Sequence, residues 1–434
     1  MNPILYLIYH FLKQLVRLSF WAYYSKITVL NRRNFRFDRP TILVSNHPNT
    51  LLDPLHAAVR VPMVVHFLAN ASLFRGAFQN WFFSTFFCIP VERPEDVNGR
   101  PLNNQQAFRQ AGAFLAGGGC LYIAPEGTSY IGRRIRPLKT GAARIALSAE
   151  NQNGFELGLS IMPVGLTYEA SNCFGRRLTV YAGEPIWIKD YEALYREDEF
   201  QAARQLTDDL EDTLRSLAIH TRNEEEDRLI ARLETLLRNS DPVSEPVHFA
   251  RVQYLIAKLR YWQENSPEPA GQFRHEVGAY FRTLEEQRTE DRALSRPPRP
   301  LWLHFAGLVL LFPVFLHGLA HNFLPAFIPV WITRRLKLDI EYNSTVKILA
   351  GLITFPLFYF LQYRLIYWLY DGQTALIYLL TLLPAGFFAW AFFRHQQRVL
   401  RYFRFRRSPE KEKLRARRQA IWEKTANLLA KKIS

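Results

Sequence analysis

Cysteine is scarce in this chain, with three residues among 434. Cys88, Cys120 and Cys173 are odd in number and have no Cys-x-x-Cys spacing, so the sequence indicates neither a disulfide framework nor a zinc site. Free thiols are typical of a reducing compartment, which favours a cytosolic setting for residues 38–190. Internal repeats and low-complexity blocks are also absent, which excludes repeat architectures.

The N-terminus lacks the features of a signal peptide. The first 24 residues are apolar and aromatic, but no basic segment precedes them and no small-residue cleavage site follows. Lys13 and Arg17 interrupt the apolar run, so its uncharged stretches are too short to span a bilayer easily. The pattern favours interfacial membrane helices within residues 1–30, and a buried core helix is the alternative.

Acidic residues are too few to balance the basic ones, and the formal net charge is +16. A basic protein attracts nucleic acid, anionic lipid or anionic substrates. No nucleic-acid-binding motif accompanies the charge, so we expect no nucleic-acid partner. The many aromatic and apolar stretches indicate the lipid bilayer as a partner instead.

Three long apolar runs lie in the last third of the chain. Residues 301–333 contain no Asp, Glu, Lys or Arg, residues 345–363 contain only Lys347, and residues 374–393 contain none. A membrane span needs about 20 apolar residues, so each run is long enough. The sequence therefore predicts an integral membrane protein, with a transmembrane region at residues 301–393 and a basic cytoplasmic tail at residues 394–434.

One histidine and one carboxylate stand six positions apart, after an apolar strand predicted at residues 41–44. This spacing suits a general base, His47, and an acid that orients it, Asp53, which would hold the imidazole in one tautomer and stabilise the imidazolium. No nucleophilic serine is needed if the substrate supplies its own hydroxyl. Taken alone, such a pair is more often structural than catalytic.

Three further apolar segments read as strands, at residues 87–91, 121–124 and 161–166. Helix-length segments such as residues 101–116 and 137–150 separate them, which predicts an α/β fold with a mixed sheet flanked by helices. Arg93 follows the first of these strands, and a Pro-Glu-Gly turn with Glu126 and Gly127 follows the second. Side chains placed there lie at a sheet's carboxyl edge, where ligands of open α/β sheets bind. The structural alternatives are a helix-capping Glu126 and a solvated Arg93.

Residues 191–300 are rich in Glu, Arg and Leu at helical spacing. They predict a charged helical region of amphipathic helices with solvated faces, to which we assign no chemistry. The Pro-rich stretch at residues 296–300 reads as a linker.

The four strand-associated segments resemble the ordered blocks of the glycerolipid acyltransferase superfamily. That family carries His-x4-Asp, a strand ending in Arg, Pro-Glu-Gly, and an apolar strand with Pro. The spacer between His47 and Asp53 is five residues, as in the yeast-type glycerol-3-phosphate/dihydroxyacetone-phosphate acyltransferase branch. The likeness covers residues 38–190, and we take residues 31–190 as the acyltransferase domain.

The resemblance implies a membrane enzyme that uses acyl-CoA or acyl carrier protein as co-substrate, with no metal or organic cofactor. The acceptor would be the hydroxyl of glycerol 3-phosphate or 1-acylglycerol 3-phosphate, in phosphatidic acid and phospholipid biosynthesis. By this resemblance Arg93 would bind the acceptor phosphate, with Lys139 as a second candidate, and Glu126 would position the acceptor or a cationic phosphate ligand. Backbone amides near Gly127 would stabilise the oxyanion.

Two departures leave the acceptor open. Ser129 stands where the family's third block often has Arg, so Arg133, Arg134 or Arg136 would have to supply that charge. Asn70 stands where the yeast-type branch often has Lys. A lysophospholipid or other lipid O-acyltransferase in remodelling, a lipid hydrolase and a degenerate, non-catalytic membrane scaffold therefore remain alternatives.

Membrane topology follows from the basic flanks of the apolar runs. Basic residues precede the first run, follow it and follow the last one, whereas residues 370–373 have none. The positive-inside rule then places these three boundaries and the catalytic domain on the cytoplasmic side. Residues 301–333 should accordingly form a re-entrant pair broken near residues 318–325, and a single helix that violates the rule is the alternative. His317 and His321 have metal-like spacing but no third ligand, which favours packing or a polar helix contact.

Overall fold

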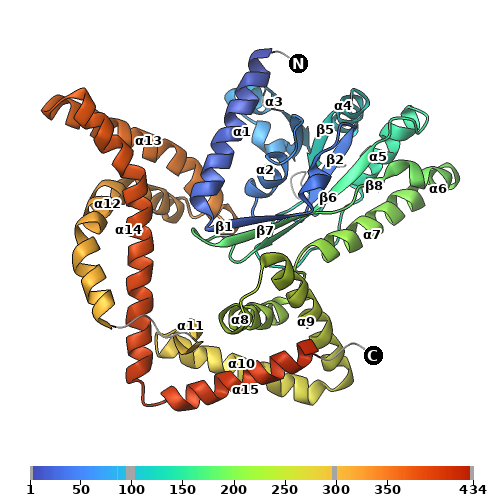
Figure 1. Ribbon diagram of the computed structural model, residues 1–434. Helices are drawn as coiled ribbons and strands as arrows, with labels where there is room; N and C mark the ends of the chain where they lie inside the picture. The colour runs from blue at the N-terminus through green and yellow to red at the C-terminus, as the bar shows by residue number, and fades with distance from the viewer. Residues whose placement is uncertain (1–2, 86, 94–102, 296–300, 431–434) are drawn as a thin grey trace. The chain divides into compact units, whose positions relative to one another are not determined.

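The computed structural model describes residues 3–85, 87–93, 103–295 and 301–430 (Figure 1). The chain divides into two compact units. The first consists of Met1–Arg222 together with Leu338–Thr345, and the second of Asn223–Lys337 together with Val346–Ser434. The Pro-rich stretch at residues 296–300, predicted as a linker, lies outside the described residues.

The first unit is built on a mixed sheet of eight strands in the order β1-β7-β6-β2-β5-β3-β4, with β8 paired to β6. The strands are β1 (Lys26–Leu30), β2 (Thr41–Ser45), β3 (Val65–Asn70), β4 (Cys88–Val91), β5 (Cys120–Ile123), β6 (Ser160–Tyr168), β7 (Arg177–Ala182) and β8 (Ile186–Trp187). The β6–β7 and β6–β8 pairs are antiparallel, and the other pairs are parallel. The four strands expected from the sequence are all present, and the predicted α/β fold is confirmed.

Helices cover both faces of this sheet. They are α1 (Pro3–Tyr23), α2 (Leu52–Ala58), α3 (Ala77–Thr85), α4 (Gln105–Ala116), α5 (Gly141–Gln152), α6 (Glu192–Glu197) and α7 (Glu199–Leu217), with short 3-10 turns at Arg32–Phe35, Ala71–Phe74 and Ile188–Tyr191. Alternate residues of the strands point to opposite faces. Ile42, Val44 and Leu121 therefore join α4, α5 and α7 in one core cluster.

The first unit extends beyond both ends of the predicted acyltransferase domain, residues 31–190. β1 (Lys26–Leu30) lies within the region predicted as N-terminal membrane helices, yet it pairs with β7, because its apolar and β-branched residues suit a strand. At the other end, α7 lies in the region predicted as solvated charged helices. Its apolar face, including Leu206 and Leu210, is buried in the sheet core, so the first unit extends to Arg222.

Helix α1 has two apolar faces. One packs on the first unit through Tyr9, Phe20 and Tyr23. The other is an exposed stripe at positions spaced by three, four or seven, which we call the α1 stripe: Ile4, Leu7, Phe11, Leu18 and Trp21. An exposed apolar stripe on an amphipathic helix is what an interfacial membrane helix presents.

The two basic residues that interrupt the apolar N-terminus, the buried Lys13 and the exposed Arg17, both bind backbone carbonyls that follow α2. The Lys13 ammonium donates a hydrogen bond to the carbonyl of Val61, and the Arg17 guanidinium donates to the carbonyl of Val59. Both carbonyls lie just after the end of α2, where cations interact favourably with the helix dipole. The two charges therefore hold α1 against α2, the helix that carries Asp53.

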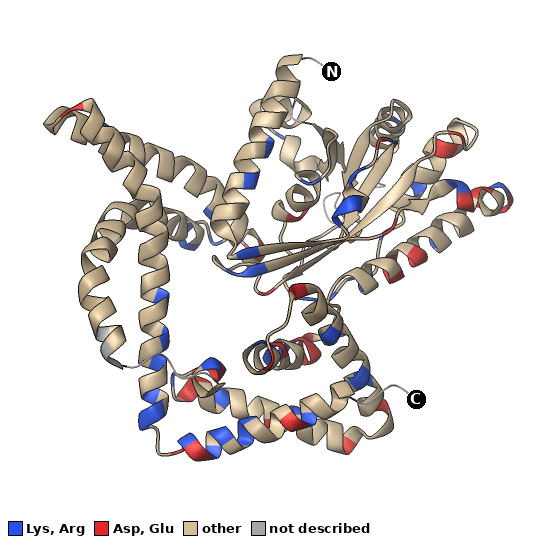
Figure 2. Cartoon of the chain, in the orientation of Figure 1, with Lys and Arg blue, Asp and Glu red and all other residues tan. Residues whose placement is uncertain are grey.

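The second unit is helical. Its helices are α8 (Glu224–Ser240), α9 (Glu245–Asn265), α10 (Pro267–Glu286), α11 (Asp291–Ser295), α12 (Leu301–Leu336), α13 (Asn343–Leu369), α14 (Gly372–Arg407) and α15 (Lys411–Ala430), the first residues of α13 belonging to the first unit. Three of them, α12, α13 and α14, are long and apolar enough to cross a membrane. Figure 2 shows that Lys and Arg are concentrated in the last part of α14 and in α15.

The basic tail is an integral part of this unit. Residues 394–407 continue α14, and α15 packs on α8, α9 and α10 through buried residues such as Leu414 and Ile421. Arg418 donates to the Asp291 carboxylate over 2.9 Å, and Tyr280 donates to the same carboxylate over 2.7 Å. Within the segment predicted as a basic tail, residues 394–434, α15 is thus buried on one face against the charged helical region.

The predicted break near residues 318–325 is absent, because α12 is one continuous helix despite three internal prolines. A proline at position i leaves the carbonyl of residue i−4 without its helical donor. Pro325 thereby frees the carbonyl of His321, and Gln362 of α13 donates to it over 3.2 Å. Pro329 frees the carbonyl of Pro325, and Thr354 of α13 donates to it over 2.9 Å. Side chains of a neighbouring helix thus replace the lost hydrogen bonds, as apolar surroundings require.

The α12 helix changes its neighbour along its length. Its first half runs antiparallel to α14, with His304 next to His395 and Phe315 next to Phe392. Its second half runs antiparallel to α13, as the contact between Pro325 and Thr354 shows. Figure 1 accordingly shows α12 as a curved helix.

The two histidines at metal-like spacing on α12 make polar helix contacts. His317 pairs with Thr381 over 3.1 Å. His321 pairs with Gln362 over 3.0 Å and with Tyr378 over 2.8 Å. Polar contacts of this kind hold helices together in an apolar environment, which agrees with the interpretation that the sequence favoured.

Replacing Thr354 by valine should destabilise the membrane helices, because it leaves the carbonyl of Pro325 without a donor. An unsatisfied buried polar group costs about 1–3 kcal/mol. We expect a lower midpoint of unfolding in detergent, measured by circular dichroism. The exposed Thr374→Val variant on α14 should lose only its local contact with Asp371 and serves as the control. Equal midpoints for the two variants would contradict this role of Thr354.

Candidate active site

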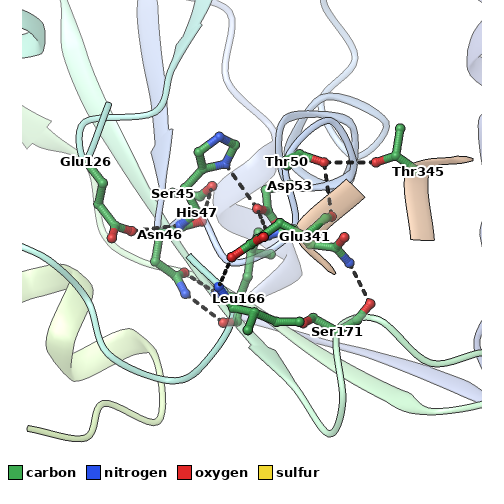
Figure 3. A network of polar contacts seen from close by, with 12 residues as sticks. Ser45, Asn46, His47, Thr50, Asp53, Glu126, Leu166, Ser171, Glu341 and Thr345 are labelled. Carbon is green, nitrogen blue, oxygen red and sulfur yellow. Dashed lines mark hydrogen bonds and ion pairs between the residues drawn. The ribbon is translucent and has the colours of Figure 1, made fainter. Parts of the chain in front are cut away.

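The loop after β2 holds the predicted base and its partner. His47 follows β2 directly, and Asp53 lies in the first turn of α2. The Nδ1 atom of His47 lies 3.1 Å from Oδ2 of Asp53. His47 is 9% exposed, whereas Asp53 is completely buried. The structure therefore brings the two residues together as the sequence predicted (Figure 3).

Two further donors fix the Asp53 carboxylate. The backbone N–H of Asn49 donates to Oδ2 over 2.6 Å, and the hydroxyl of Tyr168 donates to Oδ1 over 2.7 Å. Burial, and then the charge of Asp53, raise the pKa of Tyr168 well above its usual value, so this hydroxyl stays protonated and donates. A carboxylate held in this way assigns the proton of the imidazole to Nδ1. Nε2 then carries the lone pair and has no hydrogen-bond partner among the described residues.

Glu126 connects the two motif loops through backbone hydrogen bonds. Its Oε1 accepts the N–H of His47 over 2.8 Å, and its Oε2 accepts the N–H of Arg136 over 3.0 Å. The carbonyl of His47 also accepts the N–H of Tyr130 over 3.1 Å. Burial raises the pKa of the Glu126 carboxyl, and the two backbone donors oppose this shift. The carboxylate therefore fixes the backbone of the base, and it caps no helix.

Gly127 and Lys139 form one side of the Pro-Glu-Gly turn. Gly127 has φ of 77°, a left-handed conformation that glycine adopts without strain. A Cβ atom added to Gly127 would lie 2.7 Å from Nζ of Lys139, so the ammonium lies directly over the turn. The N–H of Lys139 donates to the carbonyl of Pro125 over 2.8 Å.

Arg93 lies on the same edge of the sheet but away from the histidine. The registers place Leu43, Tyr122, Phe67 and Cys88 side by side on β2, β5, β3 and β4. His47 lies four residues after Leu43, and Arg93 lies five residues after Cys88, so the two residues are nearly level along the strand direction. Three strand spacings, or about 14 Å, separate them across the sheet. Arg93 is half-buried, and no described contact joins it to the other site residues.

Arg136 places a positive charge on the Pro-Glu-Gly turn. Its guanidinium donates to the Thr128 hydroxyl over 3.2 Å and lies over the ring of Tyr130, 4.5 Å from the centroid. Arg134 is exposed. Arg133, Arg134 and Arg136 were the candidates for the positive charge that Ser129 does not supply. Of these, Arg136 contacts the turn itself. Asn70, at the end of β3, accepts the N–H of Ser72 and caps a short turn.

The sequence did not point to the residues that fasten these loops from elsewhere in the chain. The Asn46 side chain forms two hydrogen bonds with the backbone of Leu166 on β6, at 2.9 and 2.7 Å. Tyr168 ends the same strand. Asn46 precedes the histidine in the motif and could have been noticed, whereas Tyr168 lies 115 residues from its partner Asp53 and carries no local signal.

The segment Leu338–Thr345, which we call the linker, also reaches this site. The hydroxyls of Thr345 and Thr50 lie 3.0 Å apart, and Oε1 of Glu341 accepts the N–H of Ile131 over 3.3 Å. Figure 3 shows Thr50 with Thr345 and Glu341 beside the loop of His47 and Asp53. Polar residues between two membrane helices usually read as a solvated connection, so the sequence offered no signal for these contacts.

Comparisons with known proteins identify an acyltransferase domain within the first unit. The Acyltransferase family model matches residues 26–167. The chain is 26% identical over 252 residues to glycerol-3-phosphate O-acyltransferase 1 of Saccharomyces cerevisiae, covering 55% of this chain and 32% of that protein. It is 28% identical over 117 residues to glycerol-3-phosphate O-acyltransferase 2 of the same organism, covering 27% of this chain and 16% of that protein.

Among solved structures, the 1-acyl-sn-glycerophosphate (LPA) acyltransferase PlsC from Thermotoga maritima aligns with a TM-score of 0.36 and 18% identity, covering 50% of this chain and 82% of that one. The sequence matches identify the first unit as an acyltransferase domain of the glycerolipid type. Over part of its length the chain is related to the yeast glycerol-3-phosphate O-acyltransferases. It spans about a third of the length of the first of these relatives.

Proposed function

We propose that this protein is a membrane acyltransferase that transfers a fatty acyl group from acyl-CoA or acyl carrier protein to glycerol 3-phosphate or 1-acylglycerol 3-phosphate. The observation that carries the proposal is the geometry of His47. Its Nδ1 faces the buried Asp53 carboxylate, which leaves Nε2 as the basic atom at the carboxyl edge of the sheet. A base in this state accepts the proton of a bound hydroxyl.

The reaction needs no covalent enzyme intermediate. As Nε2 of His47 takes the hydroxyl proton, the acceptor oxygen attacks the thioester carbonyl and a tetrahedral oxyanion forms. The oxyanion then collapses and the carbon–sulfur bond breaks. The imidazolium returns the proton to the departing sulfur, so the carrier leaves as a thiol and His47 is again neutral. Gly127 donates its N–H to the carbonyl of Ala124. We therefore assign the oxyanion to the next backbone N–H groups, those of Thr128 and Ser129.

The decisive experiment is an acceptor panel. Purified full-length protein in detergent is given labelled acyl-CoA and, in turn, glycerol 3-phosphate, 1-acylglycerol 3-phosphate and a lysophospholipid with a larger head group. We expect label to appear in one of the two glycerol phosphates. Preference for the lysophospholipid would assign a remodelling activity. Release of free fatty acid without any acceptor would assign a hydrolase instead.

Arg93→Ala should raise the KM of the acceptor far more than that of the acyl donor. A charge-assisted hydrogen bond to phosphate contributes about 1.5–3 kcal/mol, so we expect an increase of about tenfold or more. Arg136→Ala and the exposed Arg134→Ala are measured alongside. If Arg93→Ala changes neither KM and Arg136→Ala raises that of the acceptor, the phosphate binds at the Pro-Glu-Gly turn.

The active site should face the cytoplasm, because the acyl donors are cytosolic thioesters. The linker belongs to the same unit as the active site, so the end of α12 should lie on that side too.

Cysteine labelling tests this topology. Leu336→Cys, Gly372→Cys and Glu410→Cys are introduced singly into a cysteine-free protein and treated with a membrane-impermeant thiol reagent on intact cells. We expect only position 372 to react, and all three to react after permeabilisation. Labelling of position 336 on intact cells would place the linker and the active site outside.

A further inference from the structure

An open cleft of about 740 Å³ lies at the edge of the sheet opposite the active site. It is lined by α1, by residues just before β2 and by residues just before β3. These two strands are both parallel to β5 and begin on the same side of the sheet. His47 follows the other end of β2, on the order of 15 Å away.

The cleft carries much more positive than negative charge. Its lining includes Lys13, Arg17, Arg36 and Arg60, and Asp38 is its one carboxylate in the described part of the chain. Burial, and then the charge of Arg17, lower the pKa of Lys13 to about 8. Burial lowers the pKa of Arg60 to about 10, with a further contribution from Arg17. These cations are held together with too little negative charge to balance them, and a bound anion would relieve their repulsion.

The cleft borders the exposed apolar face of α1. His10, Lys13 and Arg17 line it and follow one another at intervals of three and four residues, so they share one face of the helix. Successive residues of a helix are rotated by about 100° around its axis. The face with His10, Lys13 and Arg17 is therefore rotated by about 100° from the centre of the α1 stripe. With the stripe in the apolar layer of a membrane, the basic face would lie at the level of the head groups.

We propose that this cleft binds the phosphate head group of an anionic membrane phospholipid. The charge of the cleft selects an anion, and the adjacent α1 stripe distinguishes a lipid from a soluble phosphate, because the acyl chains would lie along it. Lys13 and Arg17 also hold α1 against α2, which carries Asp53. A lipid bound in the cleft would therefore hold the acyltransferase domain on a negatively charged membrane surface. The point of attachment would lie next to α2, the helix that carries Asp53.

Lipid binding to the full-length protein tests the cleft. Short-chain phosphatidylserine, short-chain phosphatidylcholine, inorganic phosphate and coenzyme A are titrated into the protein in a neutral detergent, and affinity is measured by calorimetry. Arg36→Glu is the variant, because Arg36 is exposed and lines the cleft. The control is Arg204→Glu, the same charge change at an exposed position of α7.

We expect the protein to bind phosphatidylserine at least about tenfold more tightly than phosphatidylcholine, since one charge-assisted contact is worth that much. Arg36→Glu should remove this preference, whereas Arg204→Glu and Arg93→Ala should retain it. Equal affinity for the two lipids, or a preference that survives Arg36→Glu, would overturn the proposal. So would competition by inorganic phosphate or coenzyme A at the same affinity, which would make the cleft a site for soluble anions.

The linker supports a second, independent inference, which rests on the proposed function. It joins two helices of the membrane region, yet it contacts both motif loops, through Thr50 in the loop of the base and through Ile131 after the Pro-Glu-Gly turn. Ser344 further donates to the carbonyl of Ser171 over 2.7 Å, and Asn49 of the base loop donates to the same carbonyl over 2.8 Å. The linker therefore shares partners with the loop that carries His47.

We infer that Glu341 is a positioning residue of the active site. Its carboxylate holds the N–H of Ile131, and its carbonyl lies 3.4 Å from the Thr50 hydroxyl, so one residue bridges the two loops that must meet around the substrate. Positions of catalytic groups must be held within fractions of an ångström for full activity. Glu341 would thereby hold the loop of the base and the Pro-Glu-Gly turn in a fixed relation to each other.

The test compares three linker variants in the acyl transfer assay. Glu341→Ala should lower kcat by about tenfold with little change in the KM of either substrate, and Glu341→Gln, which keeps an acceptor oxygen, should restore most of it. Asp339→Ala removes an exposed carboxylate two residues away and should leave kcat unchanged. Equal kcat for Glu341→Ala and Asp339→Ala would overturn the inference. Absence of transfer by the wild type would instead refute the proposed function.

Discussion

Replacing His47 by alanine should lower acyl transfer by about 10²–10⁴-fold, the range that a positioned general base contributes. His47 is nearly buried, and among the described residues its side chain makes one hydrogen bond, to Asp53. Asp53→Asn should have an effect of similar size. Both oxygens of the Asp53 carboxylate accept hydrogen bonds, from the imidazole, the Asn49 N–H and the Tyr168 hydroxyl, whereas an amide has only one acceptor oxygen. Rates are measured with labelled acyl-CoA and the acceptor that the panel identifies.

A folded but inactive protein is the result that supports this role. His275→Ala, at an exposed position of α10, provides the matched histidine control and should retain activity. Circular dichroism and thermal unfolding should be unchanged in His47→Ala. Near-normal turnover in a folded His47→Ala variant would refute the mechanism.

Glu126→Gln should reduce transfer strongly even though Glu126 need not touch the substrate. The carboxylate accepts two backbone N–H groups, from His47 and from Arg136. A glutamine offers one acceptor oxygen and one N–H₂ group, so in either orientation one backbone donor faces another donor. An unsatisfied buried donor costs about 1–3 kcal/mol, which corresponds to a rate loss of about tenfold to a hundredfold if the loops shift to relieve it.

The surface substitution Glu156→Gln controls for the loss of one negative charge, since Glu156 pairs with Lys189 in the solvent. We expect it to be silent. A Glu126→Gln variant with full activity would show that the loops hold their geometry without this carboxylate. A variant that alters only the KM of the acceptor would favour the family role, in which Glu126 positions the substrate.

Local sequence was sufficient for the strands and for the pair at the centre of the site. The apolar segments before His47 and Glu126 predicted β2 and β5, and parallel strands bring the residues after them to one edge. The spacing of His47 and Asp53 fits the turn and the first helical residues between them. The apolar runs likewise predicted three segments long enough to cross a membrane, because span length and composition are properties of the segment itself.

Contacts between distant segments were decided only by tertiary structure. Pairings such as Tyr168 with Asp53, or Glu341 with Ile131, depend on how the sheet and the linker fold back, and no local pattern encodes them. The same holds for α12, for which the basic flanks of the apolar run predicted a break near residues 318–325. The helix continues because Gln362 and Thr354 of α13 satisfy the carbonyls that the prolines free. A sequence reveals which hydrogen bonds a proline removes, but only the folded chain contains the neighbouring donors that replace them.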